Sequence, residues 1–219
     1  MIFVPAASDL LTFVLASLLL ALTPGPDMTL WLSRTLREGR ASGLMTLAGT
    51  SLGIGVHTML VAFGISALIV ASPLAFVVLK TFGAAYLLWL AIQALRRGSG
   101  LTIDAGDVKA AAAGAGASLS RAFFAGLSIN LLNPKIIIFF MTFLPQFVSV
   151  SDPHVTGKLI FLGVLFVFIG LPIGILVVLG AHGLSAWLRR KPQVMRVVDY
   201  VFAGVFSLFA VRILMAQAR

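Results

Sequence analysis

The chain has 219 residues, of which 60% are hydrophobic and only 11% are charged, and its mean hydropathy is +1.08. This composition excludes a water-soluble globular domain and is typical of a polytopic helical membrane protein. The formal net charge is +9, and the absence of cysteine excludes disulfides, thiolate metal sites and thiol redox chemistry.

Six apolar segments are each close to the roughly 20 residues that a helix needs to cross a bilayer. In chain order the predicted spans are Leu10–Leu32, Leu44–Ala71, Leu74–Leu95, Ala122–Val148, Leu159–His182 and Val197–Met215. Little of the chain is left outside them. We therefore predict an all-α membrane protein with six transmembrane helices in a single domain, residues 1–219.

The first predicted span is interrupted by the residues Thr23-Pro24-Gly25-Pro26-Asp27. Proline removes backbone donors, and such a break survives at membrane depth only where protein or a water-filled cavity shelters it. The restarting helix offers an N-terminus to a carboxylate, and the freed carbonyls suit an ammonium. We expect Pro24, Gly25 and Pro26 to contact a substrate, with a structural kink as the alternative.

Three ionisable residues lie within the first three spans. Asp27 follows the break, where its carboxylate suits an ammonium, a proton or the N-cap of the restarting helix. His57 is a candidate proton shuttle, or it donates one hydrogen bond to a neighbouring helix. Lys80 is a further candidate for proton coupling, and snorkelling to the membrane surface explains it equally. Proton coupling is therefore assigned to Asp27, His57 and Lys80 as candidates.

The middle of the chain, Gly98–Ser120, is rich in alanine and glycine and predicts a flexible cytoplasmic linker. It divides the chain into a first half, residues 1–97, and a second half, residues 121–219. We assign no chemistry to this linker.

A second break interrupts the fourth predicted span at Asn130–Lys135. Lys135 at membrane depth has to be paired or to face water, so its partner is either Asp27 or a substrate carboxylate. Asn130 and Asn133 offer hydrogen bonds to a substrate without a charge, and helix capping or bonds between helices are the alternative. Together with Pro134, these residues complete the predicted binding site. Paired helix breaks are typical of a transporter's binding site.

Most of the 16 Lys and Arg residues fall in three alternate loops, near Arg34–Arg40, Arg96–Arg121 and Arg189–Arg196. The positive-inside rule places these loops in the cytoplasm and both termini outside, so the charge is an orientation signal rather than a nucleic-acid site.

Three spans followed by three spans give halves of opposite orientation. A shift of 110 residues places Pro24 on Pro134 and Gly53 on Gly163, which predicts two inverted three-helix repeats with broken helices one and four.

Signatures of enzymes, metals and cofactors are missing from the sequence. His57, His154 and His182 fall on different segments, and no phosphate-binding loop occurs, so we expect no metal and no cofactor. Transport would draw on an ion gradient or on the substrate's own gradient. A passive channel, an export permease for another small polar solute or ion, and a membrane-embedded enzyme stay as alternatives.

Several motifs together resemble one family. They are Thr23–Met28, Gly49/Gly53/Gly55, Lys80–Leu87, Phe123–Asn130 with Asn133-Pro134-Lys135, Phe139-Phe140 and Leu144–Phe147. Over nearly its whole length the chain resembles the LysE/RhtB family of bacterial amino-acid exporters. The resemblance implies a non-enzymatic protein of the bacterial inner membrane that exports amino acids or close derivatives, with proton exchange as the driving force. The expected partners are the amino acid, protons and membrane lipid, with no nucleic acid, and assembly as a homodimer stays open.

Overall fold

The computed structural model describes residues 3–97 and 118–190, together with positions 193–194, 196–197, 200–201, 203–205, 207–208 and 211. The helices are α1 (Ala7–Leu22), α2 (Pro26–Glu38), α3 (Arg40–Ala71), α4 (Pro73–Arg97), α6 (Leu119–Leu131), α7 (Pro134–Phe143), the 3-10 helix η2 (Leu144–Phe147), α8 (Val155–Leu179) and α9 (Ala181–Arg190). The predicted linker falls almost entirely outside the described residues, and so does much of the predicted span Val197–Met215.

The described helices confirm a polytopic membrane protein. α3, α4 and α8 are each long and apolar enough to cross a bilayer. α1 with α2 and α6 with α7 meet the same test only as pairs, which are bent by 48° and 53° at their breaks. The described part of the chain thus contains three candidate spans, or five if each bent pair is one span. The predicted breaks in the first and fourth spans are confirmed.

Each break ends where a proline begins the next helix. Pro26 is the first residue of α2, after Gly25 in an extended conformation. Pro134 is the first residue of α7, after Asn133, whose side chain accepts a hydrogen bond from the Lys135 N–H. Proline suits this position because the first N–H of a helix has no partner within the helix. Pro134 therefore corresponds to Pro26, and the predicted alignment of Pro24 with Pro134 is wrong by two residues.

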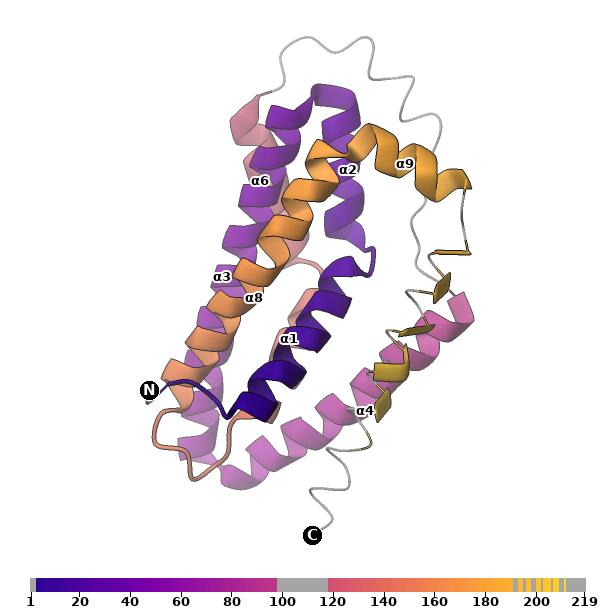
Figure 1. Cartoon of the computed structure of the whole chain (residues 1–219). Helices are drawn as coiled ribbons and strands as arrows, with labels where there is room; N and C mark the ends of the chain where they lie inside the picture. The colour runs from indigo at the N-terminus through magenta and orange to yellow at the C-terminus, as the bar shows by residue number, and fades with distance from the viewer. Residues whose placement is uncertain are drawn as a thin grey trace.

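Helix α3 contacts α2, α6 and α8, and α8 lies in front of it in Figure 1. Its approach to α6 is close because glycines lie at the contact. A Cβ on Gly49 would come within 2.8 Å of the Leu127 nitrogen, and a Cβ on Gly126 within 2.9 Å of the Thr46 carbonyl carbon. These neighbours are backbone atoms that cannot rotate away, so glycine is required for the contact.

Two buried apolar clusters lie on opposite sides of the helix breaks. The aromatic cluster, defined as Phe13, Phe139, Phe140, Phe143 and Phe166, belongs to the same core as Ile65 and Phe76, which flank the α3–α4 turn at Ser72. The smaller Met28 cluster, defined as Met28, Leu32, Val177 and Ala181, joins α8 and α9 to α2, which runs from the first break to the α2–α3 turn at Gly39. We refer to these as the Ser72 end and the Gly39 end of the bundle. Both breaks are held between the two clusters, near the middle of the bundle in Figure 1.

Candidate functional site

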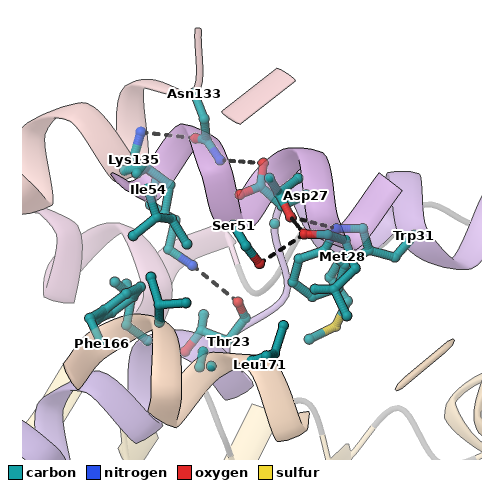
Figure 2. Close-up of a pocket in the computed structure, with 18 residues that line it drawn as sticks. Thr23, Asp27, Met28, Trp31, Ser51, Ile54, Asn133, Lys135, Phe166 and Leu171 are labelled. Carbon is teal, nitrogen blue, oxygen red and sulfur yellow. Dashed lines mark hydrogen bonds between the residues drawn. The ribbon is translucent and has the colours of Figure 1, made fainter. Parts of the chain in front are cut away.

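A cavity of about 70 Å³ lies where the two helix breaks meet α3 and α8 (Figure 2). One buried water needs roughly 10–15 Å³ measured in this way, so there is room for several waters or a small solute. The polar part of the lining comes from both breaks and from α3, and the apolar part comes mainly from α1, α3 and α8. The lining includes Leu20, Ala21, Thr23, Gly25, Asp27, Met28, Trp31, Thr50, Ser51, Ile54, Asn133, Lys135, Phe166, Gly170 and Leu171.

Asp27 connects the two breaks. Its Oδ2 accepts a hydrogen bond of 2.7 Å from Asn130 Nδ2, and its Oδ1 accepts one of 3.2 Å from Asn133 Nδ2. Two amide donors suit an ionised carboxylate, which only accepts hydrogen bonds. Asp27 does not cap α2, because the N-cap position is Gly25 and no side chain caps it. The capping alternative for Asp27 is therefore wrong, whereas Asn133 both caps α7 and contacts Asp27.

Lys135 lies in the same cavity and contacts the first break. Its Nζ donates a 3.1 Å hydrogen bond to the carbonyl of Thr23 (Figure 2). A carbonyl beside the prolines thus binds an ammonium, as the chemistry of the break suggests, and the ammonium belongs to Lys135. Lys135 and Asp27 both line this cavity. A direct ion pair between these two side chains stays a prediction.

His57 lies behind the cavity and is connected to it through Asn130. Its Nε2 is 3.3 Å from the carbonyl oxygen of Asn130. Because a carbonyl only accepts, Nε2 carries the hydrogen of this bond. The Asn130 backbone therefore contacts His57 while its side chain contacts Asp27. The imidazole is buried and is not among the groups that line the cavity.

The structure does not bring all the predicted residues together. Lys80 donates to the carbonyl of Val148 over 3.3 Å and lies over the ring of Phe76, outside the cavity lining. Pro26 and Pro134 are exposed helix starts, and Pro24 is buried outside the lining. Four of the predicted substrate contacts line the cavity, namely Gly25, Asp27, Asn133 and Lys135. Asn130 lies outside the lining and donates a hydrogen bond to Asp27.

Four polar cavity residues, Thr23, Trp31, Thr50 and Ser51, were not among the predicted substrate contacts. Trp31 Nε1 donates a 3.1 Å hydrogen bond to Thr50 Oγ1, and Ser51 lies beside Thr50 in the wall. The adjacent hydroxyls of Thr50 and Ser51 within an apolar span were an available signal, because polar groups inside a membrane usually need a partner. Among the described residues, no group of three or more His, Asp or Glu side chains is placed to hold a metal ion.

Comparison with known proteins decides the family. Residues 18–217 match the family described as LysE type translocator. The chain belongs to the LysE family. Its members are efflux transporters rather than enzymes, and the chain is accordingly a multi-pass membrane protein of this bacterial family.

Relatives of this LysE-family chain match it along nearly its whole length. A homoserine/homoserine lactone efflux protein of Salmonella typhimurium is 32% identical over 207 residues, covering 94% of this chain and 95% of the relative. A leucine efflux protein of Klebsiella pneumoniae is 27% identical over 215 residues, covering 95% of both. An uncharacterised membrane protein of Vibrio cholerae is 33% identical over 199 residues, covering 90% of this chain and 91% of the relative. No solved structure gives a significant match.

Proposed function

We propose that this chain is a secondary transporter that exports amino acids or close derivatives from the bacterial cytoplasm in exchange for protons. The observation that carries the proposal is one cavity, between two helix breaks, that contains one acidic and one basic side chain, Asp27 and Lys135. An amino acid likewise carries one carboxylate and one ammonium. The efflux of homoserine and leucine named for two relatives supports the same substrate class.

The binding mode follows from the polar groups of the cavity. The ammonium of the substrate takes a place beside Asp27, and its carboxylate lies near Lys135 and the N-terminus of α2 at Met28. The apolar wall of Ile54, Phe166 and Leu171 then faces the side chain. Because opposite charges in the cavity balance each other, a substrate with no net charge enters without leaving a charge unpaired.

Proton coupling is assigned to Asp27 in this mechanism. When the substrate ammonium leaves, the Asp27 carboxylate loses a compensating positive charge, and an unpaired charge at membrane depth is energetically costly. Uptake of a proton neutralises the carboxylate and removes that cost. The substrate and the proton then compete for one group, which is what exchange requires. His57 is the second candidate, since it contacts Asn130, whose amide binds Asp27.

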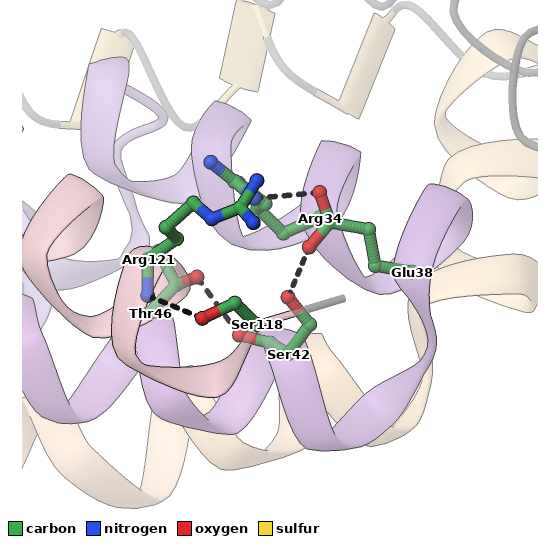
Figure 3. A network of polar contacts seen from close by, with 6 residues as sticks. All are labelled: Arg34, Glu38, Ser42, Thr46, Ser118 and Arg121. Atoms are coloured by element: carbon green, nitrogen blue, oxygen red, sulfur yellow. Dashed lines mark hydrogen bonds and ion pairs between the residues drawn. The ribbon is translucent and has the colours of Figure 1, made fainter. Parts of the chain in front are cut away.

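For the architecture we propose six spans in one domain, arranged as inverted repeats of residues 1–97 and 121–219 joined by the linker 98–120, with both termini outside. Two bent pairs that restart at Pro26 and Pro134 support the repeat. Basic residues at the Gly39 end support a cytoplasmic position for that end. There Arg34 pairs with Glu38 over 2.6 Å, Ser42 donates to Glu38, and Arg121 of α6 lies nearby (Figure 3).

Export from cells loaded with dipeptides tests the proposed function. Cells that hydrolyse the dipeptides accumulate free amino acids, and one of these should leave faster when the protein is present. Asp27→Asn should strongly reduce the acceleration, whereas Asp9→Asn, the same change in the first turn of α1 and outside the cavity lining, should keep it. Both variants have to be present in the membrane in equal amounts. If no amino acid leaves faster than from cells without the protein, the proposed function is wrong.

A further inference from the structure

Ser17 on α1 is a fully buried hydroxyl with an unusual environment. Its side chain is 0% exposed, and its Oγ has no hydrogen-bond partner among the described residues. Many other hydroxyls on or next to the described helices donate to a carbonyl three or four residues earlier in the chain. Among them are Thr23, Thr29, Thr35, Thr46, Thr50, Ser51, Thr58, Ser66, Thr81 and Thr142.

In the conformation described here, the Ser17 hydroxyl does not help the fold. A buried polar group without a partner destabilises a protein, because it has given up its hydrogen bonds to water. Alanine is nearly the same size and would avoid that cost. A serine at this point is therefore explained more readily by a second conformation, in which its hydroxyl has a partner.

The position of Ser17 indicates what that partner is. One turn further along α1, Leu20 and Ala21 line the cavity. One turn earlier, Phe13 stacks on Phe143 with ring centroids 5.8 Å apart and meets Phe147 edge-on at 5.3 Å. Ser17 thus lies between the cavity and the aromatic cluster that closes it toward the Ser72 end.

Helix α1 is the element whose movement would open this side of the cavity. It is joined to α2 through the non-helical residues Thr23–Gly25, where the chain bends by 48°. It contributes the side chains of Phe13, Ala16 and Leu20 to the core and packs against α8. α3 and α6, in contrast, are held by backbone contacts at Gly49 and Gly126. A movement of α1 would therefore turn about the non-helical residues of the break.

We propose that Ser17 is a second polar contact for the substrate, which the substrate meets when α1 swings away from α7 and the cavity opens toward the Ser72 end. This inference rests on the proposed export function and extends it to the exit route. A hydroxyl both donates and accepts, so Ser17 serves either the carboxylate or the ammonium of an amino acid that has left Lys135 and Asp27. Separation of Phe13 from Phe143 and Phe147 then completes the opening.

The chain contains no cysteine, so Ser17→Cys introduces a single thiol into the otherwise unaltered protein. In liposomes or cells that export the amino acid found by the dipeptide test, a charged, membrane-impermeant thiol reagent added outside should react with this variant. A high external concentration of the exported amino acid should slow the reaction. Leu15→Cys is the matched control: it lies on the same helix and is 51% exposed on the apolar surface, so it should stay unlabelled with or without substrate.

The kinetics of Ser17→Ala give a second readout. This variant should fold with unchanged or higher thermal stability, keep a similar KM for internal amino acid, and show a maximal export rate reduced several-fold. Substrate-protected labelling together with the slower rate supports the exit route. No labelling from outside, labelling that substrate does not slow, or export by Ser17→Ala at the wild-type rate overturns it. Failure of the wild-type protein to export any amino acid is a separate result, and it contradicts the proposed function itself.

Discussion

Gly53 is the residue that allows Asn130 to reach Asp27. A Cβ on Gly53 would lie 2.5 Å from Asn130 Oδ1 and 2.9 Å from its Cβ, so the amide occupies the space that a larger residue would fill. Two positions further along α3, a Cβ on Gly55 would meet nothing within 4 Å. The two glycines share a helix and differ in what they face, which makes them a matched pair for testing the Asp27 contacts.

Gly53→Ala should displace the Asn130 side chain and break its bond to Asp27. A hydrogen bond to a charged group contributes about 1.5–3 kcal/mol, so we expect export to fall about tenfold or more. Gly55→Ala should export normally, because alanine suits a helix better than glycine and meets no neighbour there. Export rates, corrected for the amount of each variant in the membrane, measure both effects. Normal export by Gly53→Ala would show that the Asn130–Asp27 bond is dispensable.

The two lysines within the spans are predicted to differ in role. Lys135→Met should raise the KM for the exported amino acid, because it removes the cation that faces the cavity. Lys80→Met should leave the KM unchanged, since Lys80 contacts the Val148 carbonyl outside the cavity lining. Initial export rates at several internal substrate concentrations separate the two variants. Equal KM changes in both would contradict the assignment of the binding site to Lys135.

At the scale of elements, the protein combines one rigid helix pair with two bent ones. α3 and α6 approach so closely that Gly126 contacts the backbone of Thr46. The bent pairs, in contrast, place residues at or next to their breaks in the cavity wall, namely Gly25, Asp27, Asn133 and Lys135. Their polar side chains bind across the breaks, with Asn130 and Asn133 on Asp27 and Lys135 on Thr23. The rigid pair thus positions Asn130, and the breaks leave room for substrate.

Gly126→Ala should destabilise the folded protein, because its Cβ would lie within 3.0 Å of the Thr46 Cα and neither backbone can yield without separating α3 from α6. Overpacking of this kind costs about 1–3 kcal/mol. Gly64→Ala is the control, since a Cβ there meets nothing within 4 Å. Thermal unfolding in detergent should give a lower Tm for Gly126→Ala and an unchanged or higher Tm for Gly64→Ala. An unchanged Tm for Gly126→Ala would show that the α3–α6 contact tolerates separation.

At the scale of the whole molecule, the positions of the breaks and the charged residues of the cavity were predictable from sequence. Proline, glycine and ionisable residues within apolar segments are costly enough to mark a site by themselves. The match of Pro134 with Pro26 was not predictable from sequence, because it depends on which of the two prolines of the first break begins the helix. Two further features also depend on which helix faces come together: Lys80 lies outside the cavity, and Trp31 bonds to Thr50. The apolar segments carry no polar stripe that would specify these faces.

The orientation in the membrane can be tested with single thiols, because the chain lacks cysteine. Ser151→Cys, exposed at the Ser72 end, should react with a membrane-impermeant reagent in intact cells. Arg40→Cys, exposed at the Gly39 end, should react only after the membrane is opened. The reverse pattern would place the basic Gly39 end outside. It would contradict the proposed topology, and also the proposal that substrate leaves the cell at the Ser72 end.

The proposed exchange of an amino acid for protons can be measured as proton movement in liposomes. Purified protein is reconstituted, the exported amino acid is placed on one side, and the internal pH is followed with a dye while the amino acid flows down its gradient. For the wild-type protein we predict proton flow opposite to the flow of the exported amino acid, and only when that amino acid is present. In Asp27→Asn this proton flow should be lost, even where slow amino-acid exchange persists. Amino-acid flow without any proton movement, or unchanged proton movement in Asp27→Asn, would contradict the account.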